Sequence, residues 1–211
     1  MNLNDRLKLF LVSSGFFSLF AVFSYLVKKE WLKSFDFDTT VRLQDKIPRH
    51  FDMPFSYLSL LGSLEVTGAV LLLLFFILLI YKRKFFFGLI FMPVALFFEL
   101  LGKLYLPHPS PPMFMLRYDL GVSFPSFYVH TPFSYPSGHM LRTLFIACVL
   151  AFLFNKYLKN KYVKYSLIFS LFIITCVMFV SRIYLGEHWF SDVAGGVLIG
   201  LSGALMAVAV F

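Results

Sequence analysis

Six long apolar runs, separated by shorter polar segments, dominate the pattern of the chain. They cover residues 7–27, 54–81, 85–102, 137–154, 165–180 and 192–211. Each run is close to the length of about 20 residues that an α-helix needs to cross the hydrocarbon core of a bilayer. Because only helices and closed barrels satisfy their backbone hydrogen bonds in lipid, the pattern predicts an all-α fold. We expect a polytopic bundle of six transmembrane helices, built as a single domain over residues 1–211.

Two polar segments are long enough to have structure of their own. Residues 28–53 are polar and mixed in charge, and their aromatic residues, such as Trp31 and Phe35, favour a segment that lies in the membrane interface. Residues 103–136 hold seven of the chain's 10 prolines. This density argues against any long regular element there and predicts an extended loop between the third and fourth helices.

The last apolar run is rich in small residues. Gly196, Gly200 and Gly203, with Ala204, recur at helical spacing within it. Small residues at such spacing let two transmembrane helices approach closely, so we expect this face to pack against the rest of the bundle.

The orientation follows from the basic residues beside the runs. Basic clusters lie at 82–84 and 156–164, and the positive-inside rule places such loops in the cytoplasm. Segment 28–53 is also basic and would lie outside, which weakens this assignment. We expect both termini inside the cell, the plasma membrane as the location, and the loops at 103–136 and 181–191 on the side away from the cytoplasm.

Composition excludes two broad classes of protein. The chain is 59% hydrophobic and only 14% charged, more apolar than a soluble domain of 211 residues can bury. The net charge of +8 comes from clusters beside apolar runs, which is typical of membrane flanks and not of a nucleic-acid surface. Cys148 and Cys176 both lie inside apolar runs, so we interpret them as buried thiols that form no disulfide.

A histidine and an aspartate begin the last helix. His188 and Asp192 are four residues apart and share a face if the helix starts near His188. A carboxylate on one ring nitrogen fixes the tautomer and makes the other nitrogen a better nucleophile. The alternative is a histidine held at a helix start by a capping aspartate.

Cations and a helix start lie at neighbouring span ends. Lys103 opens the Pro-rich loop, and Arg182 follows the fifth run. Fixed cations stabilise the charge of a transferring phosphoryl group, although interfacial snorkelling explains one such residue equally well. Ser137, Gly138 and His139 begin a helix after Pro136. A helix N-terminus favours anions, and a histidine there can protonate a leaving oxygen; the alternative is a capping serine and an idle histidine.

Together these blocks resemble the type 2 phosphatidic acid phosphatase family, which shares its fold with the vanadium haloperoxidases. The family pattern is K-x6-R-P, then P-S-G-H, then S-R-x5-H-x3-D. The second block is complete at residues 136–139, and the third is complete from Ser181 to Asp192. The first block departs from the pattern. Lys103 and Pro111 are present, but Ser110 stands where the family has arginine.

The resemblance implies a role for each matching position. His188 looks like the nucleophile that forms a phosphohistidine, Asp192 the residue that orients it, and His139 the general acid. The positions that match the phosphate cradle are Lys103, Ser137, Gly138 and Arg182. No metal and no cofactor is implied, because the cations supply the positive charge.

Ser110 leaves one cation of the cradle to be replaced. Arg142 lies three residues after His139 and shares its face on a helix, and Arg117 lies in the long loop. We favour Arg142 as a phosphate-binding residue, with a salt bridge to Glu65 or Glu99 as the alternative. Glu99 is four residues before Lys103 and is placed to pair with it.

These features predict a membrane lipid phosphatase. The substrate classes that suit it are phosphatidate, phosphatidylglycerol phosphate and a polyprenyl diphosphate. The alternatives are a lipid phosphotransferase of the same fold, or an inactive structural or transport protein that keeps the fold. The missing arginine favours the inactive alternative, and the filled nucleophile, orienting and acid positions oppose it. No nucleic acid is expected as a partner.

Overall fold

The chain forms a helical bundle. The computed structural model describes residues 1–81, 86–118, 120 and 131–211, and within them every regular element is a helix. The α-helices are α1 (Leu3–Lys28), α2 (Lys33–Lys46), α3 (Asp52–Ser59), α4 (Leu64–Tyr81), α5 (Phe91–Tyr105), α6 (Gly138–Tyr157), α7 (Lys161–Tyr184) and α8 (Phe190–Val210). The 3-10 helices are η1 (Arg49–Phe51), η2 (Leu60–Gly62), η3 (Phe86–Ile90) and η4 (Met113–Met115).

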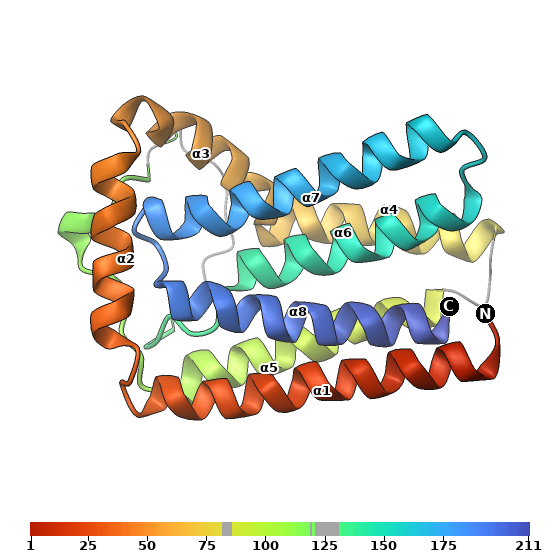
Figure 1. Ribbon diagram of the computed structural model, residues 1–211, viewed down its shortest axis with the longest axis horizontal. Helices are drawn as coiled ribbons and strands as arrows, with labels where there is room; N and C mark the ends of the chain where they lie inside the picture. Colours follow the sequence, from red (N-terminus) through yellow and green to blue (C-terminus); the bar gives the residue numbers. More distant parts are fainter. Residues whose placement is uncertain (82–85, 119, 121–130) are drawn as a thin grey trace.

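Six helical segments of the described residues are long and apolar enough to cross a membrane, with η3 and α5 together forming one of them. The predicted all-α bundle of six transmembrane helices is confirmed. The six lie side by side, whereas α2 runs across one end of the bundle (Figure 1). Both chain termini lie at the opposite end (Figure 1), as an even number of crossings requires.

Helix α8 lies against α1, α5 and α6, and its small residues make this close packing possible. A Cβ on Gly196 would lie 2.5 Å from the carbonyl oxygen of Ser137, and one on Gly200 would lie 3.0 Å from that of Leu141. The predicted packing face is therefore confirmed. Against α1, the buried Ser13 hydroxyl donates to the Ser202 carbonyl at 2.8 Å. Interhelical hydrogen bonds of this kind stabilise helix pairs where lipid supplies no hydrophobic drive.

The second span begins ten residues later than its apolar pattern predicts. Residues 52–62 form α3 and η2 instead, and α4 starts at Leu64. Ser63 makes the break, because its backbone is extended (φ −63°, ψ 158°) and its hydroxyl accepts the Val66 N–H at 3.2 Å. This is the geometry of a helix N-cap. Hydropathy continues across the break and cannot reveal it.

Segment 28–53 contains α2, whose buried face is polar. Asp36 and Thr40 point inward, while Trp31, Phe35 and Phe37 are exposed. Exposed aromatics suit the predicted interfacial location, which remains a prediction. The helix thus contacts the bundle through buried polar residues as well as through Leu43 and the ring of Phe35, which lies 5.0 Å from that of Phe190.

The remaining boundaries differ for local reasons. Helix α5 continues to Tyr105, and in the described part of 106–136 the one regular element is η4, in keeping with the prolines. Helix α7 continues to Tyr184, so Ser181 and Arg182 lie in its last turn and not in a loop. Cys148 is partly buried, but Cys176 is exposed on α7, so the expectation of a buried thiol is wrong for Cys176. The basic segment 82–84 lies outside the described residues.

Candidate active site

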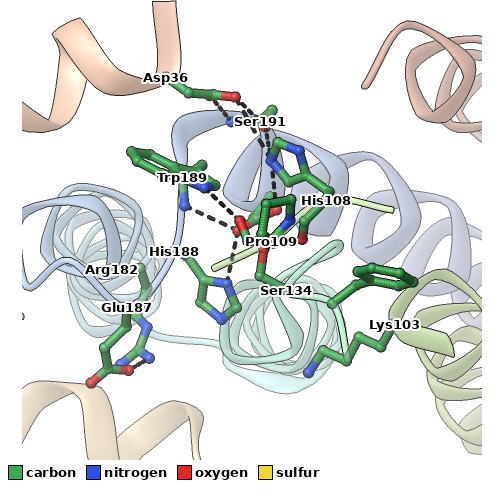
Figure 2. Close-up of polar contacts among 12 residues, drawn as sticks. Asp36, Lys103, His108, Pro109, Ser134, Arg182, Glu187, His188, Trp189 and Ser191 are labelled. Atoms are coloured by element: carbon green, nitrogen blue, oxygen red, sulfur yellow. Dashed lines mark hydrogen bonds and ion pairs between the residues drawn. The ribbon is translucent and has the colours of Figure 1, made fainter. Parts of the chain in front are cut away.

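Residues from four helix ends meet at the end of the bundle that α2 covers. Lys103 lies in the last turn of α5, Arg182 in the last turn of α7 and Asp192 in the first turn of α8. His139 lies in the first turn of α6. His188, which Figure 2 labels, precedes α8. The structure therefore brings the three sequence blocks to one place.

His188 and Asp192 are in direct contact. His188 Nδ1 lies 3.2 Å from Asp192 Oδ2, and the same oxygen accepts the backbone N–H of Trp189 at 3.0 Å. Asp192 therefore both caps the start of α8 and contacts His188. The capping role and the orienting role that the sequence allowed for this pair are thus compatible. The contact places the ring proton on Nδ1 and leaves the lone pair on Nε2.

The surroundings of His188 favour its neutral form. Burial, and then the positive charges of Arg182 and Lys103, hold its pKa well below the ordinary value of 6.5. A neutral imidazole with a free Nε2 lone pair is the form that can act as a nucleophile.

Arg182 is the largest fully buried side chain of the described residues, with 1% of its surface exposed. Its Nη2 pairs with the Glu187 carboxylate, but Nε and Nη1 have no hydrogen-bond partner in the described parts of the chain. Interfacial snorkelling is excluded, because the guanidinium does not reach the surface. Buried donors without partners are costly, and an anion bound at this point would satisfy them.

The start of α6 is tied to the start of α8. The Ser137 backbone N–H donates to the Asp192 carbonyl at 2.9 Å, and the buried Ser137 hydroxyl has no hydrogen-bond partner among the described residues. Gly138 allows the close approach of two charged side chains, since a Cβ there would lie 2.0 Å from Glu99 Oε1 and 2.7 Å from Arg142 Nη1 and would displace them. The helix N-terminus therefore faces a compact cluster of charges.

Glu99 is the carboxylate at the centre of that cluster. Its Oε1 lies 2.8 Å from Lys103 Nζ, as the spacing of four residues predicts, and its Oε2 lies 3.7 Å from Arg142 Nη1. Arg142 Nε also donates to the Gly62 carbonyl at 3.0 Å. Arg142 thus forms the salt bridge that was the alternative to phosphate binding, although it stays beside the site.

The other candidate for the missing cation is held elsewhere. Arg117 Nη1 donates to the Tyr184 hydroxyl at 3.3 Å, and its guanidinium lies 5.2 Å from the centre of the same ring. The exposed Ser110 lies in the Pro-rich loop.

Three further polar residues belong to this site, and the sequence pattern did not reveal them. His108 Nε2 lies 3.4 Å from Asp192 Oδ1 and 3.0 Å from the Ser191 hydroxyl (Figure 2). Ser191 also binds Asp36 of α2 through its N–H and its hydroxyl, both at 2.8 Å. The one sequence feature that could have indicated His108 is its position, five residues after Lys103. Asp36 has no signal, because only the tertiary structure brings α2 over this end of the bundle.

Comparison with known proteins connects this arrangement with membrane phosphatases. The model of the PAP2 superfamily matches residues 84–211. Over 71 residues, 33% of this chain, the sequence is 37% identical to phosphatidylglycerophosphatase B of Bacillus subtilis strain 168, and the match spans 34% of that protein.

Two solved structures are similar to this chain. The first is a transmembrane PAP2-type phosphatidylglycerolphosphate phosphatase from Bacillus subtilis, with a TM-score of 0.75, 18% identity, and coverage of 93% of this chain and 94% of that one. The second is LpxE of Aquifex aeolicus, with a TM-score of 0.60, 23% identity, and coverage of 82% and 94%. At these identities the likeness shows the fold.

Proposed function

The chain belongs to the PAP2 superfamily, and from that premise we propose that it is a membrane phosphatase that removes a phosphate group from a lipid. The observation that carries the proposal is the fully buried Arg182, which has two unpartnered donors beside a neutral histidine oriented by Asp192. An anion-binding cation next to an oriented nucleophile is what phosphoryl transfer requires.

The proposed reaction has two steps. His188 Nε2 attacks phosphorus, and the bond to the lipid oxygen breaks while His139 gives that oxygen a proton. This step yields a phosphohistidine and a lipid alcohol. When the substrate is a diphosphate, the lipid product is a monophosphate. In the second step a water molecule gives a proton to His139 while its oxygen attacks phosphorus. The bond between phosphorus and His188 Nε2 breaks, which releases inorganic phosphate and restores the lone pair of Nε2.

The cradle would stabilise the charge that develops on the phosphoryl oxygens. The donors we assign to it are Arg182, Lys103, the Ser137 hydroxyl and the free N–H groups at the start of α6 around Gly138. We include Arg142 as an additional cation because it shares Glu99 with Lys103. Fixed cations neutralise this charge, so the proposed reaction needs no metal ion.

We propose phosphatidylglycerol phosphate first among the substrates, because both the curated relative and one structural neighbour carry phosphatidylglycerophosphate phosphatase names. Phosphatidate and a polyprenyl diphosphate remain candidates with the same reacting group. The site is proposed to face away from the cytoplasm in the plasma membrane. A lipid phosphotransferase would form the same phosphohistidine and differ in its acceptor.

Release of inorganic phosphate from purified protein in detergent tests the proposal. The three lipids are supplied separately, with and without a chelator, and with vanadate, which mimics five-coordinate phosphorus. We expect release from at least one lipid, resistance to the chelator and inhibition by vanadate. No release from any lipid, or strict dependence on an added divalent ion, would contradict the proposal.

A further inference from the structure

Asp192 is held from two sides by different histidines. Its Oδ2 contacts His188 Nδ1 and the Trp189 N–H, whereas its Oδ1 faces His108 Nε2 at 3.4 Å. The carboxylate is fully buried, and His108 is 8% exposed. Oδ1 forms no hydrogen bond within the described parts of the chain, and His108 Nε2 and Ser134 are polar groups that act on this carboxylate. His108 is therefore placed to orient this oxygen through a long contact.

The direction of the hydrogen bonds around His108 can be assigned. Asp36 accepts the Ser191 N–H on Oδ1 and the Ser191 hydroxyl on Oδ2. Because the hydroxyl proton points to Asp36, the Ser191 oxygen can only accept from His108. The 3.0 Å contact therefore places the proton of His108 on Nε2, where it also faces Asp192 Oδ1.

The protonation states of Asp36 and His108 agree with these hydrogen-bond directions. Burial raises the pKa of Asp36 to about 6, so at neutral pH it is ionised and can only accept. Burial lowers the pKa of His108, although Asp192 and Glu30 act in the opposite direction, so the ring is neutral and carries one N–H. The backbone is fixed as well, since the His108 carbonyl accepts the Ser134 N–H at 3.0 Å and its hydroxyl at 3.1 Å.

We propose that His108, oriented by Asp36 through Ser191, is a positioning residue whose Nε2–H fixes the Asp192 carboxylate so that Oδ2 stays aimed at His188. It would act through Asp192 and not on the phosphate itself. Its effect on turnover rests on the proposed function, but its effect on the tautomers of the two histidines does not. None of Asp36, His108 and Ser191 stands at a specified position of the three sequence blocks, although His108 and Ser191 occupy unspecified positions within two of them. Asp36 comes from α2 and His108 from the Pro-rich loop.

The substitution Asp36→Asn tests the direction of the hydrogen bonds from His108 through Ser191 to Asp36, with almost no change in the shape of the side chain. An amide has one accepting oxygen, so either the Ser191 N–H or its hydroxyl loses its acceptor. The hydroxyl can then turn and donate to His108 Nε2, which moves the ring proton to Nδ1 and removes the donor that faces Asp192.

The first readout is the tautomer of each histidine, measured by NMR of detergent-solubilised protein labelled with 15N-histidine. In the wild type we expect Nε2–H for His108 and Nδ1–H for His188. In Asp36→Asn we expect Nδ1–H for His108 and a mixture for His188. Signals are assigned with the single variants His108→Gln and His188→Gln. An unchanged His108 tautomer in Asp36→Asn would overturn the proposal even if no substrate were known.

The second readout is the split between kcat and KM for release of phosphate from short-chain phosphatidylglycerol phosphate. His108→Leu removes the donor and should lower kcat by about 10-fold or more, the size of one hydrogen bond to a charged group, with KM within about twofold. His108→Gln keeps an N–H donor and should recover most of the loss. Equal loss in the leucine and glutamine variants, or a loss in KM alone, would contradict a positioning role.

Thr40→Val is the matched control. Thr40 is buried on the same face of α2, and its hydroxyl donates to the Asp36 carbonyl at 3.1 Å, not to the carboxylate. Its loss should leave both tautomers and kcat unchanged. If Asp36→Asn does not fold, the leucine and glutamine pair still decides the question. If the wild type releases no phosphate from any lipid, the proposed function fails and the NMR result stands on its own.

Discussion

Glu99 Oε1 and Lys103 Nζ lie 2.8 Å apart, one helical turn from each other on α5, and both face the start of α6. The same carboxylate reaches the buried Arg142 at 3.7 Å. Two cations assigned to phosphate binding therefore share one buried anion. Removing Glu99 takes the shared anion away from both cations, whereas removing either cation leaves Glu99 with a partner.

We expect Glu99→Ala to lower the free energy of unfolding by about 3 kcal/mol, because it removes the carboxylate that pairs with the buried Arg142. Arg142→Ala alone should cost less, and the double variant should be more stable than the sum of the two losses predicts. Reversible denaturation in mixed detergent micelles measures this cycle. Additive losses would show that Glu99 and Arg142 do not stabilise each other.

The same variants test whether Arg142 also binds phosphate. If it does, Arg142→Ala should lower kcat/KM by about 2 kcal/mol of transition-state stabilisation, as expected for one oxyanion donor. Arg117→Ala is the control, since Arg117 is held by Tyr184. Ser110→Arg should recover part of the loss in the Arg142→Ala background. Full activity of a folded Arg142→Ala variant would limit this residue to its salt bridge.

Gly138→Ala should abolish activity while Gly68→Ala does not. A Cβ at Gly138 would lie 2.0 Å from Glu99 Oε1 and 2.6 Å from its carboxyl carbon, so the Glu99 carboxylate beside Lys103 must move. A Cβ at Gly68, also on a transmembrane helix, meets nothing within 4 Å. Phosphate release and thermal midpoint are measured for both variants. Wild-type turnover in Gly138→Ala would mean that the cluster tolerates a shift at the helix start.

His188→Ala should lower kcat by about 1,000-fold or more, because it removes the proposed covalent nucleophile. Asp192→Asn should also cost heavily, since it disturbs the tautomer of His188. His50→Ala is the control, because His50 is exposed outside the site. Acid-labile, base-stable 32P label on the wild type and none on His188→Ala would support the intermediate. Label that survives in His188→Ala would place the nucleophile elsewhere.

Stability should depend on pH through His188. Its pKa is held well below 6.5 in the folded protein by burial, so below pH 6.5 the unfolded chain takes up a proton that the folded chain does not. The contribution of His188 to stability is therefore lost as pH falls from 7.5 to 5. His188→Gln lacks this loss, so its thermal midpoint should rise relative to the wild type over that range. A constant difference between the two midpoints would contradict a depressed pKa.

The orientation is tested by cysteines placed at Ser110 and Asn160, which are both exposed. Cys148 and Cys176 are first replaced by alanine. We expect an impermeant thiol reagent to label position 110 in intact cells and position 160 only after lysis. Equal labelling of both positions in intact cells would overturn the predicted topology. Ser126, another position in the same loop, lies outside the described residues.

The apolar runs alone determined the fold class, because a hydrocarbon solvent leaves a chain with this pattern almost no choice but helices. The spacing of His188 and Asp192 also predicted their contact, but for a different reason: His188 lies before α8, and Asp192, which caps the helix start, reaches back to it. Residue spacing within one helix also predicted the pairing of Glu99 with Lys103. These relationships are local, so a sequence read along one helix contains them.

Only the tertiary structure decided which distant residues complete the site. Asp36 meets Ser191 across 155 positions of sequence, and His108 meets Asp192 from a loop whose path no periodicity describes. The sequence left three possible partners for Arg142 open: Glu65, Glu99 and a bound phosphate. The packing of α5 against α6 placed Glu99 beside it. Ser63 ended one helix and began another inside an unbroken apolar run. Hydropathy reports only the preference of each residue for lipid, whereas these contacts depend on how separate helices meet.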